Sequence, residues 1–153
     1  MTLKTLLVLL YFSWGFSANS QTDSSKLFEM KKGTLSGPIL APSGKLKIEI
    51  SKSSDSSYAA SYQMDSSYVV IAIFDGLVIT SEIVGWYYQV TTKYGNYFIT
   101  YDGLQKPLVK KGDFVKAGQT ISAVGNNLHN TYFFNLFIFD TKNSFDPMLW
   151  LKH

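Results

Sequence analysis

One stretch of this 153-residue chain decides its fold: Val109-Lys110-Lys111-Gly112-Asp113-Phe114-Val115-Lys116-Ala117-Gly118-Gln119-Thr120-Ile121. It has the form V-x-x-G-D-x-V-x-x-G-Q-x-I, in which an apolar residue recurs every six positions. We expect Gly112 and Gly118 to take positive φ in two tight turns, because glycine has no Cβ that would clash there. The recurring apolar residues are then free to point inward. Such a turn–strand–turn unit is typical of a flattened β-sandwich.

The rest of the chain contains short runs rich in β-branched and aromatic residues, bounded by Gly, Asn, Asp or Ser, which predict strands. These runs are Leu46–Ile50, Tyr68–Phe74, Leu77–Ile83, Trp86–Thr92, Tyr97–Tyr101, Thr120–Val124 and Tyr132–Phe139. Tyr68–Phe74 is continuously apolar, which predicts a central strand covered on both faces. Ser51–Ser67 contains eight serines and is predicted to be a loop, or a weak strand around Tyr58–Gln63. No stretch has a helical period, so the predicted class is all-β, a mainly antiparallel β-sandwich.

The first twenty residues are predicted to be a signal peptide. Lys4 precedes an apolar run of about a dozen residues, and Ala18-Asn19-Ser20 fits a cleavage site that leaves Gln21 as the mature N-terminus. An uncleaved membrane anchor is the alternative, but the run is short for a span of ~20 residues. We therefore expect an exported protein, periplasmic or secreted, with no transmembrane segment after cleavage. Residues 21–35 are predicted to be a flexible lead-in, and residues 36–153 one β domain.

Composition excludes several classes of function. The chain has no cysteine, which removes thiol catalysis, disulfides and cysteine-bound zinc. All 14 basic residues are lysines. Without arginine the chain has no guanidinium group that could form paired hydrogen bonds with a phosphate or a guanine, so nucleic-acid binding is not expected. Only two histidines occur, His129 and His153. Any chemistry based on histidine is limited from the outset.

Further blocks flank the central stretch in a fixed order. They are Val70-Ile71-Ala72-Ile73-Phe74-Asp75-Gly76-Leu77-Val78, Tyr101-Asp102-Gly103-Leu104, Val124-Gly125-Asn126, and Leu136-Phe137-Ile138-Phe139 followed by Asp146-Pro147-Met148-Leu149-Trp150-Leu151. In order and spacing they resemble the V-x-A-x-x-x-G-x-V, Y-A-H-L, I-G-x-x-G and D-P-x-x-W/Y-L motifs of the lysostaphin/LytM-type murein endopeptidases, a family of zinc metallopeptidases. The resemblance covers Val70 to Leu151 and implies a fold of the barrel-sandwich hybrid type, the duplicated hybrid motif.

The histidines of that family are missing from this chain. Family members hold zinc with two His and one Asp, and two further His act on the bound water. Carried over by spacing, the H-x-x-x-D positions fall on Ser57 and Ser61, the histidine of Y-A-H-L falls on Gly103, and the two histidines of H-x-H-F fall on Phe133 and Asn135. We therefore expect a degenerate member, a pseudo-peptidase with no catalytic residue, metal ligand or cofactor.

The vacated site is predicted to remain as a groove lined by Tyr101, Asp102, Phe133, Asn135 and His129. The resemblance implies that an inactive member binds peptidoglycan, or docks on and regulates an envelope hydrolase or another envelope protein. Two alternatives stay open. One is an active zinc endopeptidase on peptidoglycan with atypical ligands, in which His129 joins Asp65 or Asp102. The other is a structural or adaptor β domain with no connection to murein.

Overall fold

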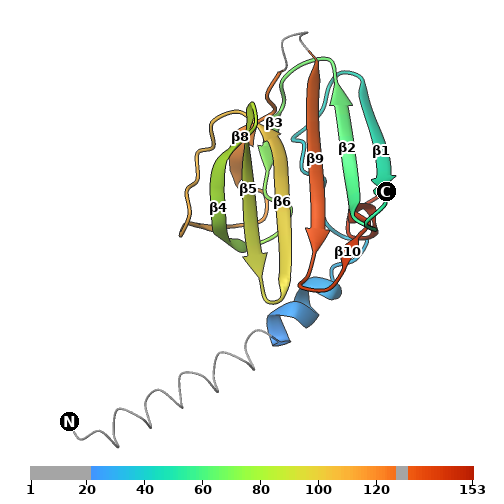
Figure 1. Ribbon diagram of the computed structural model, residues 1–153, viewed down its shortest axis with the longest axis vertical. Coiled ribbons are helices and arrows are strands. Elements are labelled where there is room, and N and C mark those ends of the chain that lie inside the picture. The colour runs from blue at the N-terminus through green and yellow to red at the C-terminus, as the bar shows by residue number, and fades with distance from the viewer. Residues whose placement is uncertain (1–21, 127–130) are drawn as a thin grey trace, which may run out of the picture.

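The computed structural model describes residues 22–126 and 131–153 (Figure 1). Its elements in chain order are β1 (Leu46–Lys52), β2 (Tyr58–Met64), β3 (Val69–Ile71), β4 (Gly76–Val84), β5 (Tyr87–Tyr94), β6 (Tyr97–Leu104), β7 (Phe114–Val115), β8 (Thr120–Ala123), β9 (Tyr132–Phe139), β10 (Ser144–Phe145) and the 3₁₀ helix η1 (Pro147–Leu149). The strands form a large sheet in the order β1-β2-β9-β6-β5-β4-β7, with β10 beside β9, and a small sheet of β3 and β8. All of their pairings are antiparallel, which confirms the predicted class.

The two glycines of the central stretch have the predicted conformation. Gly112 has φ +96° and Gly118 has φ +84°. The recurring apolar residues Val109, Val115 and Ile121 are all buried in the core. The stretch therefore folds as its spacing indicates, with two turns that direct three side chains inward.

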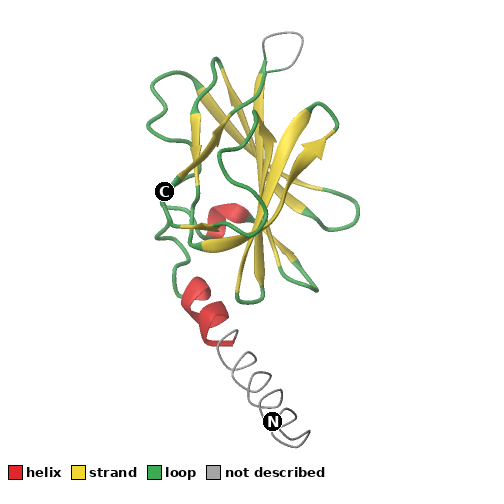
Figure 2. Cartoon of the chain, turned by 90° about the vertical axis from the view of Figure 1, so that its left-hand side faces the viewer, coloured by secondary structure: helices red, strands yellow, loops and turns green. Residues whose placement is uncertain are grey.

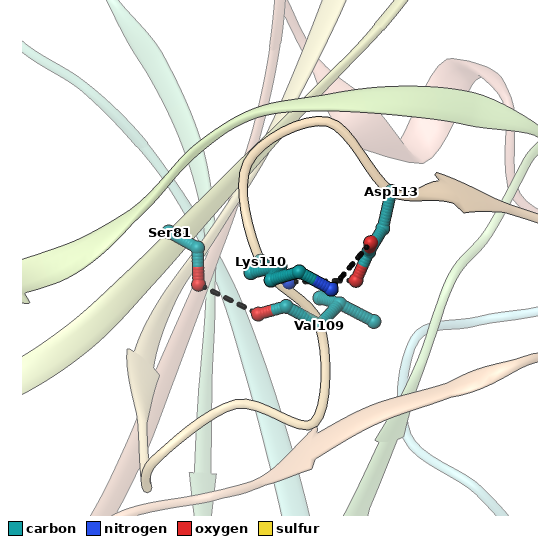
Figure 3. Close-up of polar contacts among 4 residues, drawn as sticks. All are labelled: Ser81, Val109, Lys110 and Asp113. Carbon is teal, nitrogen blue, oxygen red and sulfur yellow. Dashed lines mark hydrogen bonds and ion pairs between the residues drawn. The ribbon is translucent and has the colours of Figure 1, made fainter.

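Polar contacts hold the first of these turns in place (Figure 3). The Lys110 backbone N–H donates to Asp113 Oδ2 over 2.9 Å, and Lys110 Nζ lies 3.1 Å from Asp113 Oδ1. From β4, the Ser81 hydroxyl donates to the Val109 carbonyl over 2.9 Å. The turn is thus closed on itself by a side chain and joined to the large sheet by one hydrogen bond.

The continuously apolar run 68–74 does not form a central strand of the large sheet, contrary to the prediction. Only Val69–Ile71 is a strand, and it pairs with β8 in the small sheet. Ile73 and Phe74 are buried beyond the end of this strand. The Ile73 N–H donates to the Tyr101 hydroxyl over 2.9 Å and so links this segment to the large sheet. The run is apolar because most of its side chains are buried in the core. This burial does not require a strand on each side of β3, which pairs with β8 alone among the named strands.

The serine-rich segment contains β2, a long strand between β1 and β9. Of the two alternatives for this segment, the strand around Tyr58–Gln63 is therefore correct. Ala60, Tyr62 and Met64 point to the core, whereas Ser61 lies on the opposite face. Ser61 is the only serine in β2, and most of the others lie outside the strands, so the serine-rich composition of the segment obscured the strand.

The lead-in is not flexible throughout its length, which corrects the prediction for residues 21–35. Residues 22–29 are helical, and the helix lies at one end of the β domain (Figure 2). Phe28 is fully buried, with its ring centroid 5.3 Å from Trp150, 5.0 Å from Phe74 and 4.9 Å from Tyr97. The Trp150 indole N–H also donates to the Phe28 carbonyl. A single anchoring aromatic residue leaves no periodic pattern, so the sequence did not reveal this helix.

The predicted signal peptide and its cleavage site lie outside the described residues. Within residues 22–126 and 131–153, no helix is both long and apolar enough to cross a membrane.

A bulge in the large sheet places one glycine where no side chain fits. Tyr88 pairs with Leu104 and the next residue of β5, Gln89, pairs with Asp102, so Gly103 is the extra residue of β6. Gly103 has φ +84°, and a Cβ on it would clash with the Phe133 carbonyl oxygen. Any other residue at this position would therefore be disfavoured, both by the positive φ and by a steric clash with the backbone of β9.

Replacing Phe28 with alanine is expected to destabilise the fold by about 3–5 kcal/mol, because it removes a buried ring from the aromatic cluster. Leu27→Ala is the matched control, since Leu27 is 43% exposed and should cost less than about 1 kcal/mol. Urea unfolding of the full chain measures both changes. Equal losses for the two variants would contradict the placement of Phe28.

Gly103→Ala is expected to destabilise the chain more than Gly112→Ala does. Both positions have positive φ, which costs about 1–2 kcal/mol for alanine, but a Cβ at Gly112 meets nothing within 4 Å. The difference between the two variants isolates the contact with the Phe133 carbonyl. Thermal unfolding measures it, with Gly37→Ala as a control in open space without positive φ. Indistinguishable losses for Gly103→Ala and Gly112→Ala would refute the close approach.

Candidate functional site

A row of polar side chains crosses the outer face of the large sheet, the face turned away from the core. Its members are paired directly across neighbouring strands from β4 to β1, so they point to the same side. We call this set the polar row: Glu82, Gln89, Asp102, Asn135, Ser61 and Glu49. The sheet therefore brings together six residues that lie far apart in the sequence.

Hydrogen bonds connect the centre of the polar row. The Ser61 hydroxyl donates to Asn135 Oδ1 over 2.8 Å, and Asn135 Nδ2 donates to Asp102 Oδ2 over 3.2 Å. The Asn135 amide sets the direction of these two hydrogen bonds, because its nitrogen donates and its oxygen accepts. Asn135 uses both ends of its amide in these two bonds. Its side chain is thereby held between β2 and β6.

A groove of about 630 Å³ adjoins the polar row. Its floor consists of outer-face residues of three strands, Gln89 of β5, Thr100 of β6, and Phe137 and Phe139 of β9. Residues 55–58 and 140–144 form its two walls. The Tyr58 N–H donates to the Ser144 hydroxyl over 2.8 Å and ties these walls together. Aromatic and hydrogen-bonding groups thus share one open surface.

Both walls carry a carboxylate that is stabilised in its charged form. Hydrogen bonds from the Ser53 hydroxyl and from the Ser57 backbone N–H hold the pKa of Asp55 below its usual range. Partial burial raises the pKa of Asp140, but the backbone N–H groups of Lys142 and Asn143 outweigh it and leave the pKa lowered. Each wall therefore presents a negative charge at neutral pH.

Tyr101 does not line the groove, which corrects the prediction for this residue. It is fully buried and points to the core, because neighbouring residues of a strand face opposite sides and Asp102 faces outward. Burial raises the pKa of the Tyr101 hydroxyl. That hydroxyl accepts the hydrogen bond from the Ile73 N–H described above and contributes to the fold.

Asp102, Phe133 and Asn135 do not line the groove either, which corrects the prediction for these residues as well. The groove lies one outer-face position further along β6 and β9, at the pair Thr100–Phe137. The positions carried over from the family motifs are only partly brought together. Asn135 and Ser61 are in direct contact, and Phe133 lies on the same face of β9, about two-fifths exposed. Ser57 lies in a groove wall, four residues before Ser61 and on the order of 13 Å along an extended chain. Gly103 is the bulge residue beside Asp102. His129 lies outside the described residues.

The side chains at the centre of the row do not fit a zinc ion. Zinc sites in proteins draw three or four ligands from Cys, His, Asp and Glu. Here the donors are one hydroxyl, one amide and one carboxylate, and the hydroxyl and amide are hydrogen-bonded to each other. In the part of the chain that the structure describes, no three His, Cys, Asp or Glu side chains are grouped so that they could hold a metal. The metal of the lysostaphin/LytM type thus has no matching ligand set among these residues.

Most of the groove lining was not predicted from the sequence. Gln89, Thr100, Phe137 and Phe139 line the groove although no family motif includes them as site residues. The alternation of a strand was the available signal: with the polar Asn135 on the outer face, Phe137 and Phe139 follow it onto that face, opposite the buried Leu136 and Ile138.

Comparison with known proteins places the chain in a family. Its sequence matches Peptidase family M23 over residues 55–147. This match includes the polar row from Ser61 to Asn135 and the whole groove. No curated protein matches the chain.

Several solved structures share the fold. A chain of the SpoIIQ–SpoIIIAH pore forming complex has a TM-score of 0.65 at 16% identity, over 79% of this chain and 92% of that chain. The putative peptidase M23 from Pseudomonas aeruginosa has a TM-score of 0.62 at 17% identity, over 86% of this chain and 60% of that chain. For lysostaphin the TM-score is 0.59 at 20% identity, over 76% of this chain and 53% of that chain.

At these identities the structural likeness shows the fold alone, whereas the sequence match spans more than half of the chain. It also agrees with the order of the motifs from Val70 to Leu151. The chain belongs to Peptidase family M23 and is of the lysostaphin/LytM type.

Proposed function

We propose that this chain is an exported, non-hydrolytic M23 domain that binds peptidoglycan at the cell envelope. The proposal has three parts, which are loss of the metal centre, retention of a binding groove, and export. Each part has its own support and its own test.

The observation that carries the proposal is the hydrogen bond between Ser61 and Asn135. By spacing, Ser61 takes the place of the aspartate of the family's H-x-x-x-D motif, and Asn135 takes the place of a histidine of its H-x-H-F motif. A serine hydroxyl and a carboxamide bind zinc poorly, and here they satisfy each other. Asn135 is further engaged by Asp102. A site built in this way lacks the metal-activated water on which hydrolysis by this family depends.

The groove supports binding without hydrolysis. Phe137 and Phe139 offer apolar surface, and Gln89 and Asn143 offer hydrogen-bonding groups beside it. Peptidoglycan is a polymer of amino sugars and short peptides, so it presents both apolar faces and many polar groups. Aromatic side chains bind such ligands with little loss of conformational entropy. An open groove also admits a polymer, which an enclosed pocket would exclude.

A second candidate function is docking on another envelope protein, including a murein hydrolase that the domain regulates. It is favoured by the fold likeness to a chain of the SpoIIQ–SpoIIIAH complex, which is an assembly of two proteins. The same groove would then receive a protein segment. Binding to purified sacculi free of protein distinguishes the two candidates, because only the first predicts it.

Export rests on the sequence of residues 1–20, where a short apolar run follows Lys4 and precedes a site for cleavage. A peptidoglycan-binding domain must reach the periplasm or the cell exterior to meet its ligand. Mass spectrometry of the protein from its native envelope tests this part, and we expect an N-terminus at Gln21.

The purified chain is expected to retain far less than one zinc per molecule after dialysis against trace zinc, and to release no fragments from peptidoglycan. Elemental analysis and a turbidity assay on sacculi measure these quantities, with a zinc-loaded M23 peptidase as the positive control. One zinc per chain, or hydrolysis abolished by a chelator, would overturn the proposal. His129 would then be the first ligand to mutate.

Phe137→Ala is expected to weaken binding to purified sacculi about tenfold, because it removes apolar contact surface from the groove floor. Phe114→Ala is the matched control, since Phe114 is 53% exposed on β7 at the far edge of the sheet. Co-sedimentation with sacculi measures both variants, and circular dichroism checks their folding. Equal binding by the two variants would exclude the groove as the binding site.

A further inference from the structure

The large sheet ends in a long, regular strand whose outer edge is open. Among the described residues β1 pairs only with β2, through seven consecutive residues and without a bulge (Figure 1). At the other edge of the sheet, β7 has only two residues, and β4 next to it is bulged. Every second residue of β1 directs its N–H and C=O away from β2. These backbone groups are ready to pair with another strand.

The side chains of β1 are also incompletely covered. Ile48 and Ile50 point to the apolar side of the sheet but are 41% and 42% exposed. A hollow of about 240 Å³ lies beneath this side, lined by Leu46, Ile48 and Tyr62 together with residues of the 37–42 loop and the C-terminal segment. On the other side, Lys47 and Glu49 form an exposed ion pair. An added strand would therefore need apolar residues on one side and charged residues on the other.

The sequence of β1 itself meets this requirement. We propose that β1 pairs antiparallel with β1 of a second copy of this chain, so that two large sheets join into one. With Ile48 opposite Ile48 of the second copy, Lys47 lies opposite Glu49 of that copy, and Glu49 opposite its Lys47. Leu46 and Ile50 face each other in the same register. Directly opposed residues in antiparallel strands are close enough for each of these pairs to interact.

Neighbouring registers lack this complementarity. A register centred on Glu49 places two glutamates opposite each other, and one centred on Lys47 places two lysines opposite each other. Like charges directly opposite are destabilising. A shift of one residue would move the isoleucines to the charged face. Charge and burial therefore select one register, and this register has the two-fold symmetry of a dimer.

The pairing has a consequence for the groove. A two-fold axis perpendicular to the joined sheet keeps both outer faces on the same side, so the two grooves would face in one direction. If the grooves bind peptidoglycan, as proposed above, the dimer would attach at two points and gain avidity. The dimer itself does not depend on that function, and its test uses no peptidoglycan.

Sedimentation velocity of the full chain tests the proposal. A single strand pair buries less than the ~1,600 Å² of a standard interface, so we expect weak association. The 17.2 kDa chain should shift from monomer to dimer between about 1 and about 300 µM, and high salt should weaken the dimer. A chain that stays monomeric over this range would overturn the proposal and leave the edge to a different partner strand.

Charge exchange tests the register. Lys47→Glu places two glutamates opposite each other at each pair, and Glu49→Lys does the same with lysines, so each variant should raise the dimer dissociation constant at least tenfold. A mixture of the two variants restores opposite charges at both pairs and should dimerise again. Folding should survive, because both side chains are exposed and such pairs contribute little to stability. Lys106→Glu, an exposed lysine outside β1, controls for net charge.

Each outcome of the exchange is decisive. Loss of the dimer in both single variants and its recovery in the mixture would establish the pairing. A dimer that survives Lys47→Glu, or a mixture that stays monomeric, would show that any association uses another surface or register, and would overturn the proposal.

Discussion

The pairing of β9 along both of its edges is the constraint on which the rest of the structure depends. One edge pairs with β6, and the other pairs with β2 and then with β10. Without β9, the β1–β2 hairpin would have no connection to the sheet of β4, β5 and β6. Backbone hydrogen bonds on both sides fix its register, and a slip of one residue would exchange its two faces. The position of every side chain on β9 follows from this pairing.

The same register separates the core from the candidate site. Phe134, Leu136 and Ile138 are fully buried on one face of β9, whereas Asn135 lies on the other face between Ser61 and Asp102. One face of β9 thus packs in the core, and the other face contributes to the candidate site. Changes on the outer face leave the buried face intact, so a fold of this family can persist while its ligand positions change.

This separation explains how an M23 fold can carry Ser61 and Asn135 at the centre of the polar row. Packing depends on residues that the site does not use, among them the aromatic cluster around Trp150 and the double-glycine stretch. The site depends on outer-face residues that the core does not use. The Ser61 hydroxyl and both ends of the Asn135 amide have hydrogen-bond partners without a metal, so they do not destabilise the sheet as unpaired polar groups would.

The sequence by itself determined the all-β class, the two turns at Gly112 and Gly118, and the family, because turn residues and local alternation act over a few positions. It also led us to expect Ser61 and Asn135 at positions of the family's motifs. Only the tertiary structure decided that these two residues touch, that Tyr101 faces the core, and that Phe28 anchors the lead-in. Strand register and long-range packing set these contacts between residues tens of positions apart, and no local pattern in the chain records them.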